Sequence, residues 1–118
     1  MDKYEYNVKL EEINQLVNEE NYEEAARVAD TIEWKRVRNV RTLCMVSEIY
    51  EADGRLEDSK EILLRAYRRS PNVRAILYRL VEICVKMKEF DDAVEFYTQY
   101  VQSAPNDNSR YILKYKIY

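Results

Sequence analysis

The side chains that most often perform catalysis or bind metals are scarce in this sequence. Histidine is absent, and the only cysteines, Cys44 and Cys84, lie far apart, each within an apolar run. A zinc site of the usual Cys/His kind and a Ser-His or Cys-His catalytic pair are therefore excluded. Separate cysteines within apolar runs are typical of buried thiols in a protein from a reducing compartment.

Carboxylates are abundant, but they occur as neighbours in the sequence, as in Glu11-Glu12, Glu23-Glu24 and Asp91-Asp92. General acid–base catalysis requires carboxylates that converge in a desolvated cleft, whereas adjacent residues on a helix diverge. The sequence also lacks a glycine-rich phosphate loop and a nucleophile elbow. We therefore predict that the protein is not an enzyme and binds no cofactor or metal.

Charge is distributed unevenly along the 118 residues, whose net charge is −3. Residues 1–34 contain 3 basic and 10 acidic side chains, whereas residues 35–88 contain 13 basic and 7 acidic ones. Such bipolarity suits a surface that discriminates among charged partners, but it could equally reflect helices that alternate in charge to stay soluble.

Five arginines cluster in the basic part of the chain: Arg65, Arg68, Arg69, Arg74 and Arg79. They could contact phosphates or an acidic peptide, or they could pair with nearby carboxylates on a solvated helix surface. Because the chain is acidic overall, we favour the structural interpretation and do not expect nucleic acid as the partner.

The elements that must position these side chains follow from a repeat. The only prolines, Pro71 and Pro105, are 34 residues apart, and alignment on this period matches Leu43 with Leu77. Ser59 matches Ala93 in the same way. This period belongs to one class of repeating helical hairpins.

Within each period, apolar residues recur every three or four positions, which indicates one face of a helix. Asp53-Gly54 provides a turn between two helices, and Asn21 followed by Glu24 has the spacing of a capping box. Strict alternation, the pattern of a strand, is not sustained anywhere. We predict an all-α fold with helices near residues 3–18, 22–34, 38–52, 56–69, 73–87, 90–103 and 107–117.

The repeated positions resemble the tetratricopeptide repeat. The segment 40–73 is the best copy, with Leu43, Val46, Ser47, Tyr50, Gly54, Ser59, Leu63, Ala66 and Pro71 in the motif's positions. The segment 74–107 is similar, but Val81 and Tyr100 replace small residues and Lys88 replaces a glycine. The segment 6–39 is the least similar, with Val37 in place of the proline.

The resemblance implies a right-handed α-α superhelix, a solenoid of about three helical hairpins in a single domain over residues 1–118. The repeats would lie near 6–39, 40–73 and 74–107, followed by a terminal helix over 108–118. It also implies a scaffold for protein–protein interaction that binds a peptide or partner protein in a concave groove lined by the first helix of each hairpin. Among the groove positions carried over by register, we select Arg41, Glu48, Tyr78, Glu82 and Lys116, because tyrosine and arginine are favoured in binding hot spots and the other three offer charge.

Residues 108–118 resemble the first helix of a fourth repeat that lacks its second helix. Capping helices usually have a polar outer face, whereas this segment is rich in tyrosine and isoleucine. We therefore expect the chain to be a fragment of a longer repeat protein, and we expect the exposed end to favour a homodimer through this helix.

Two other functions stay open: an RNA-binding helical-repeat module, and a non-catalytic region of a larger enzyme or regulator. Salt dependence separates RNA binding from peptide binding, because affinity for nucleic acid falls steeply with salt. The first residues, Met1 to Glu5, are acidic and polar, unlike a signal peptide, and no apolar run has the length of a membrane span. We expect a cytoplasmic protein without a membrane segment.

Overall fold

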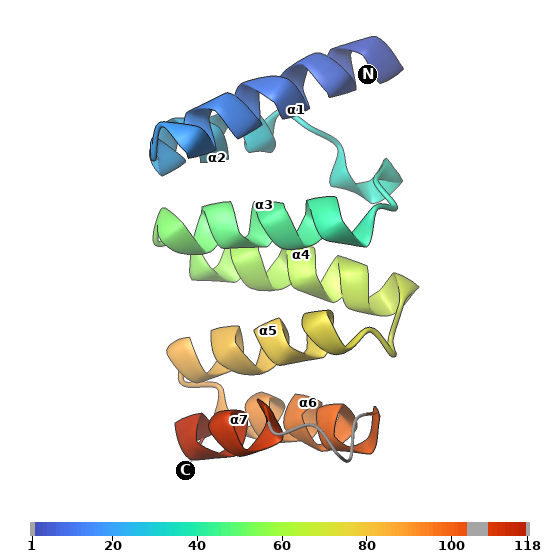
Figure 1. Cartoon of the computed structure of the whole chain (residues 1–118), viewed down its shortest axis with the longest axis vertical. Coiled ribbons are helices and arrows are strands. Elements are labelled where there is room, and N and C mark those ends of the chain that lie inside the picture. Colours follow the sequence, from blue (N-terminus) through green and yellow to red (C-terminus); the bar gives the residue numbers. More distant parts are fainter. Residues whose placement is uncertain (1, 104–108, 118) are drawn as a thin grey trace. The chain divides into compact units, whose positions relative to one another are not determined.

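The structure, a computed structural model, describes residues 2–103 and 109–117. Every regular element in these residues is a helix, which confirms the all-α prediction (Figure 1). The elements are α1 (Lys3–Asn18), α2 (Tyr22–Asp30), the 3-10 helix η1 (Trp34–Arg36), α3 (Val40–Ala52), α4 (Leu56–Arg69), α5 (Arg74–Lys86), α6 (Phe90–Ser103) and α7 (Ser109–Ile117). Pro105, Tyr118 and the expected start of the last helix at residue 108 lie outside the described residues. None of the described helices is both long enough and apolar enough to cross a membrane.

The chain forms two compact units, residues 1–62 (unit 1) and 63–118 (unit 2), whose boundary falls within α4. In unit 1, α1 and α2 form a hairpin, and α2 packs against α3. In unit 2, α5 and α6 form a hairpin, and α7 lies beside both of these helices (Figure 1). Each unit therefore contains one hairpin and the helix that begins the next one. The single domain over 1–118 stays a prediction.

The turns inside the hairpins repeat every 34 residues. Glu20, Gly54 and Lys88 occupy the left-handed region, with φ of 59°, 80° and 62°. The residue after each one donates its N–H to a carbonyl five positions earlier: Asn21 to Leu16 at 2.9 Å, Arg55 to Tyr50 at 2.8 Å, and Glu89 to Cys84 at 2.8 Å. This is the Schellman arrangement that ends a helix. The repeat therefore includes the first hairpin, which the sequence pattern matched least.

Side-chain caps begin three of the helices. Asp2 Oδ1 accepts the N–H of Glu5 at 2.8 Å at the start of α1. Asn21 and Asn39 cap α2 and α3 in the same way, accepting backbone N–H groups at 3.3 Å and 3.1 Å. The cap predicted at Asn21 is thus present, and it satisfies one of the N–H groups that a helix start leaves without a partner.

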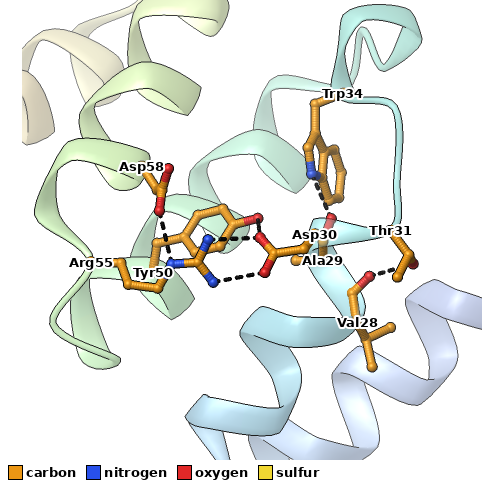
Figure 2. Close-up of polar contacts among 8 residues, drawn as sticks. All are labelled: Val28, Ala29, Asp30, Thr31, Trp34, Tyr50, Arg55 and Asp58. Atoms are coloured by element: carbon orange, nitrogen blue, oxygen red, sulfur yellow. Dashed lines mark hydrogen bonds and ion pairs between the residues drawn. The ribbon is translucent and has the colours of Figure 1, made fainter.

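The second helix ends at Asp30, four residues earlier than predicted. Trp34 belongs to η1, where its buried indole turns back and donates Nε1–H to the carbonyl of Ala29 at 2.9 Å (Figure 2). Thr31 Oγ1 also donates to the carbonyl of Val28 at 2.7 Å. These side chains satisfy carbonyl groups that the last turn of α2 leaves without helical partners. The chain can therefore leave the helix there. Helix α3 then begins at Val40, after the cap, instead of at residue 38.

Small buried residues allow the helices to approach one another closely. In unit 1, Ala25 and Ala29 of α2 are fully buried, and Ser59 Oγ donates to the carbonyl of Ser47 at 2.8 Å. In unit 2, Ala93 of α6 is fully buried at the position that Ser59 has in the preceding repeat. The hydroxyl of Ser59 can be buried in the core because it has a hydrogen-bond partner.

Candidate functional site

Three of the five residues selected from the sequence come together in unit 2. Tyr78 and Glu82 are four residues apart on α5 and therefore share a face, and Lys116 comes from α7. Lys116 Nζ lies 2.8 Å from Glu82 Oε2 and 6.0 Å from the centroid of the Tyr78 ring. The side chains of Lys116 and Glu82 are 42% and 26% exposed. The three residues form one solvent-accessible surface, here called the Tyr78 surface.

Buried neighbours hold the Tyr78 surface in place. Leu77 and Val81 alternate with Tyr78 and Glu82 along α5, and they form a buried core together with Tyr100 of α6. The Tyr78 and Tyr100 rings meet edge to face, with centroids 5.8 Å apart and an interplanar angle of 65°. From α7, Ile117 packs against the same core, and it is the residue next to Lys116. An edge-to-face pair restricts the orientation of Tyr78 while leaving part of its ring exposed.

Tyr100 is the supporting residue that the site prediction did not include. Its position in the repeat is that of Ala66, and the sequence pattern marks it as a departure from a small residue. The structure shows that the larger ring is buried against Tyr78. The tyrosine at position 100, where the motif has a small residue, was therefore the sequence feature that could have indicated an aromatic contact in this repeat.

The chemistry of the Tyr78 surface is that of recognition. It presents an aromatic face, a carboxylate and an ammonium group to solvent, at distances that suit an ion pair and a weak cation–π contact. A partly exposed ion pair contributes only about 0–1 kcal/mol to stability. Both charged groups can therefore exchange their mutual contact for contacts with a ligand at little energetic cost.

Arg41 and Glu48 lie in unit 1, both on α3 and both exposed. They are seven residues apart, close to two helical turns, and therefore lie on one side of α3. Glu48 occupies the position in its repeat that Glu82 occupies in the next one. A single groove that includes all five selected residues stays a prediction.

A polar cluster that the sequence did not reveal lies in unit 1 (Figure 2). Two guanidinium nitrogens of Arg55 donate to the two carboxylate oxygens of Asp30 at 2.9 Å and 2.8 Å. Arg55 Nε donates to Asp58 at 2.8 Å, and the Tyr50 hydroxyl donates to Asp30 at 2.9 Å. We call these four residues the Asp30 clamp. It joins the end of α2 to the turn between α3 and α4.

Electrostatics within the Asp30 clamp favour the charged forms of Asp30 and Arg55. Hydrogen bonds from Arg55 hold the pKa of the Asp30 carboxyl below its usual value, and those to Asp30 raise the pKa of Arg55. Burial, together with the bond to Asp30, raises the pKa of Tyr50 far above its usual value. Because Asp30 and Arg55 are 25 residues apart and match no motif, only the fold brings them together. The clamp is a stabilising contact.

Side chains that could bind a metal do not gather in the part of the chain that the structure describes. There, no group of three His, Cys, Asp or Glu side chains could hold a metal ion. Cys44 and Cys84 are thiols. Each of the five clustered arginines has an interaction within the chain, and the structural interpretation of that cluster stays a prediction.

Solved structures that share the fold of this chain include two complexes with protein segments. The Yersinia enterocolitica type III secretion chaperone SycD, in complex with a peptide of the translocator YopD, has 10% sequence identity and a TM-score of 0.72. That match covers 98% of this chain and 88% of SycD. PcrH, in complex with the chaperone-binding region of PopD, has 8% identity and a TM-score of 0.70, over 99% of this chain and 88% of PcrH. At these identities the likeness concerns the fold alone.

The sequence profile of the tetratricopeptide repeat matches residues 50–114, more than half of the chain. No curated protein sequence matches this chain. The profile covers most of the segment 40–73, the whole of the segment 74–107 and the first part of the segment that follows, and it agrees with the turns that recur every 34 residues. The predicted fold class, an all-α helical repeat, is confirmed by the helices, the two solved structures and the profile. The chain therefore belongs to the tetratricopeptide repeat family.

Proposed function

We propose that this protein is a non-enzymatic scaffold that binds a segment of a partner protein, and that the Tyr78 surface contacts this segment. The observation that carries the proposal is the meeting of Tyr78, Glu82 and Lys116, from two helices, on one supported and partly exposed surface. Aromatic residues held by packing are favoured in binding hot spots, and the neighbouring charges orient the ligand.

The two similar structures support this function. SycD is in complex with a peptide of YopD, and PcrH is in complex with the chaperone-binding region of PopD, so this fold accommodates protein segments. For this chain, the chemistry of the Tyr78 surface favours a segment with an apolar side chain for Tyr78 and charged groups for Glu82 and Lys116. Arg41 and Glu48 of α3 are proposed as further contacts.

We also propose a cytoplasmic location, which the two thiols support because disulfides persist mainly in oxidising compartments.

A homodimer through α7 is proposed on the basis of exposed apolar side chains. Tyr111 and Ile112 on this helix are 57% and 55% exposed, and neighbouring exposed apolar side chains favour association. Sedimentation velocity of the wild type and of Ile112→Glu tests this contact. A concentration-dependent dimer that the variant abolishes supports it, and a wild type that stays monomeric at all concentrations contradicts it.

A selection for peptides tests the proposed function. The chain is used to select binders from a phage-displayed library of random peptides, and the selected peptides are titrated into ¹⁵N-labelled protein. We expect amide shifts around Tyr78, Glu82 and Lys116 on α5 and α7. Lys116→Ala is expected to weaken binding at least about tenfold, which is the effect of a hot-spot residue.

Lys114→Ala is the matched control, since it removes an exposed lysine from the same helix outside the Tyr78 surface. It is expected to leave the affinity unchanged. Selected peptides whose shifts avoid α5 and α7, or equal affinities for the two lysine variants, would contradict the proposed site. Failure to select any peptide would contradict the function.

A further inference from the structure

Unit 1 contains a cavity of about 350 Å³ between the start of α1 and the segment that connects α2 to α3. Its apolar part is formed by Tyr6, Ile32 and Val37, of which the last two are buried. Its rim carries the exposed cations Lys3, Arg36 and Arg38. The volume lies at the lower end of the range for ligand pockets, which suits one inserted side chain better than a large ligand.

Hydrogen bonds hold the segments that form the walls of this cavity. The bond from the Trp34 indole to Ala29 anchors the connecting segment to α2. Within this segment, Val37 N–H donates to the carbonyl of Trp34 at 3.1 Å, and Asn39 caps α3. On the opposite wall, the carboxylate of Asp2 caps α1. A pocket with a preformed wall binds without the entropic cost of ordering a loop.

The charge around the cavity favours an acidic ligand. Residues 34–47 contain four basic side chains and no acidic one. Of the two carboxylates at the rim, Asp2 already accepts the cap bond, and Glu33 lies 3.6 Å from Arg36 with both side chains largely exposed. An exposed pair at this distance is weak, so Arg36 can turn to a ligand carboxylate. Basic groups around an apolar cavity match an apolar side chain flanked by carboxylates.

We propose that this cavity is a second binding site, which takes an acidic protein segment with one apolar anchor residue. The anchor inserts between Tyr6, Ile32 and Val37, and the flanking carboxylates pair with Arg36, Arg38 and Lys3. The site lies wholly in unit 1, and its residues are separate from the Tyr78 surface. A negative result at this site would therefore not contradict the proposed function, and a positive result would not depend on it.

An NMR titration of the whole ¹⁵N-labelled chain tests the site. The probe is the blocked pentapeptide Glu-Asp-Phe-Asp-Glu, and two control peptides replace Phe by Ser or all four acidic residues by Lys. We expect amide shifts at Tyr6 and residues 32–39, an affinity at least about fivefold lower for the serine peptide, and no shifts there with the lysine peptide. Equal affinity of the serine and phenylalanine peptides, or shifts confined to other residues, would overturn the proposal.

Charge reversal identifies the groups that bind. The double variant R36E/R38E is expected to lose at least tenfold in affinity for the pentapeptide. K88E/K114E changes the net charge equally, at residues that do not line the cavity, and is expected to keep the affinity. Glutamate is suitable at position 88 because Glu20 adopts the same turn conformation as Lys88. Equal losses in the two variants would show a non-specific charge effect and overturn the proposal.

Two further arms complete the test. If R36E/R38E does not fold, Arg38→Gln replaces it, with a loss of at least threefold expected and an unchanged affinity counting against the site. A single-stranded RNA of twelve nucleotides is titrated in parallel. Larger shifts of the same amides with the RNA than with the pentapeptide would overturn the choice of a protein segment as the occupant.

Discussion

Unit 1 and unit 2 contain the same local backbone, a helical hairpin with a Schellman turn between its two helices, whose second helix packs against the helix that follows it. In unit 1, however, charged residues tie these elements together. Asp30 accepts hydrogen bonds from Tyr50 and from two nitrogens of Arg55, so the clamp fixes α2 against the end of α3.

In unit 2, the positions equivalent to Tyr50 and Arg55 are Cys84 and Glu89, which cannot form the same clamp. The charges there lie instead on a partly exposed surface, where Glu82 and Lys116 pair beside Tyr78. The difference shows that the repeat determines the backbone, while the side chains at individual positions decide whether a junction between helices is fixed by polar contacts or available to a ligand.

Substitution at the small-residue position that both units contain is expected to change the free energy of unfolding the most. Ala93→Asp would bury an unpaired charge between helices and should cost about 3–5 kcal/mol, enough to unfold much of the chain. Ala93→Ser is the control, because Ser59 occupies the same position in the preceding repeat, and it should cost far less. Thermal unfolding followed by circular dichroism measures both. An unchanged melting temperature for Ala93→Asp would contradict the shared register.

The clamp and the Tyr78 surface should respond differently to loss of a carboxylate charge. Asp30→Asn is expected to lower the free energy of unfolding by about 1–2 kcal/mol, since charge-assisted hydrogen bonds contribute about 1.5–3 kcal/mol and the Asp30 side chain is 42% exposed. Glu82→Gln is expected to cost less than about 1 kcal/mol. Urea unfolding measures both values, and equal values would remove the distinction between the units.

The clamp should also make stability depend on pH in one direction. Because Arg55 lowers the pKa of Asp30 in the folded state, the stabilisation is complete above the unfolded pKa of about 3.9. It is lost as the pH falls through the lower folded pKa. The difference in unfolding free energy between wild type and Asp30→Asn should therefore be constant near neutral pH and shrink below about pH 4. A difference that persists undiminished at pH 2 would show that the bond to Asp30 does not depend on its charge.

Opposite substitutions in two equivalent turns should change the free energy of unfolding by smaller amounts and in opposite directions. Gly54→Ala should cost about 1 kcal/mol, because φ is 80° there and a left-handed conformation strains residues that have a Cβ. A Cβ at this position meets no atom within 4 Å, so the cost is purely conformational. Lys88→Gly should stabilise by about 0.5 kcal/mol, since relief of strain exceeds the added entropy of the unfolded chain. Changes of the same sign in the two variants would contradict the equivalence of the turns.

The sequence predicted most of the fold, because period and helical periodicity are local signals. Helices α1, α4 and α6 have the predicted bounds, and Gly54 forms its turn as expected. The early end of α2 was not predicted, since it depends on Trp34 folding back to a carbonyl that helical periodicity cannot identify. The repeat placed Lys88 at the motif's glycine position, but the residue types of Glu20 and Lys88 did not indicate that either would adopt the left-handed conformation of a glycine.

The candidate site was predictable in part. Register together with residue type selected Tyr78, Glu82 and Lys116, because the repeat places equivalent residues on equivalent faces and tyrosine and charged side chains suit recognition. The Asp30 clamp and the cavity beside Arg38 were not predicted, since both depend on the irregular segment after α2 or on pairs distant in sequence.

The most direct test measures stability and peptide binding together in two variants, Asp30→Asn and Lys116→Ala, with peptides selected on the wild type. Asp30→Asn is expected to lower the urea midpoint and to keep the affinity for the selected peptides. Lys116→Ala should keep the urea midpoint close to that of the wild type and weaken binding at least about tenfold. If both variants change stability and affinity in the same proportion, the clamp and the Tyr78 surface do not have separate roles.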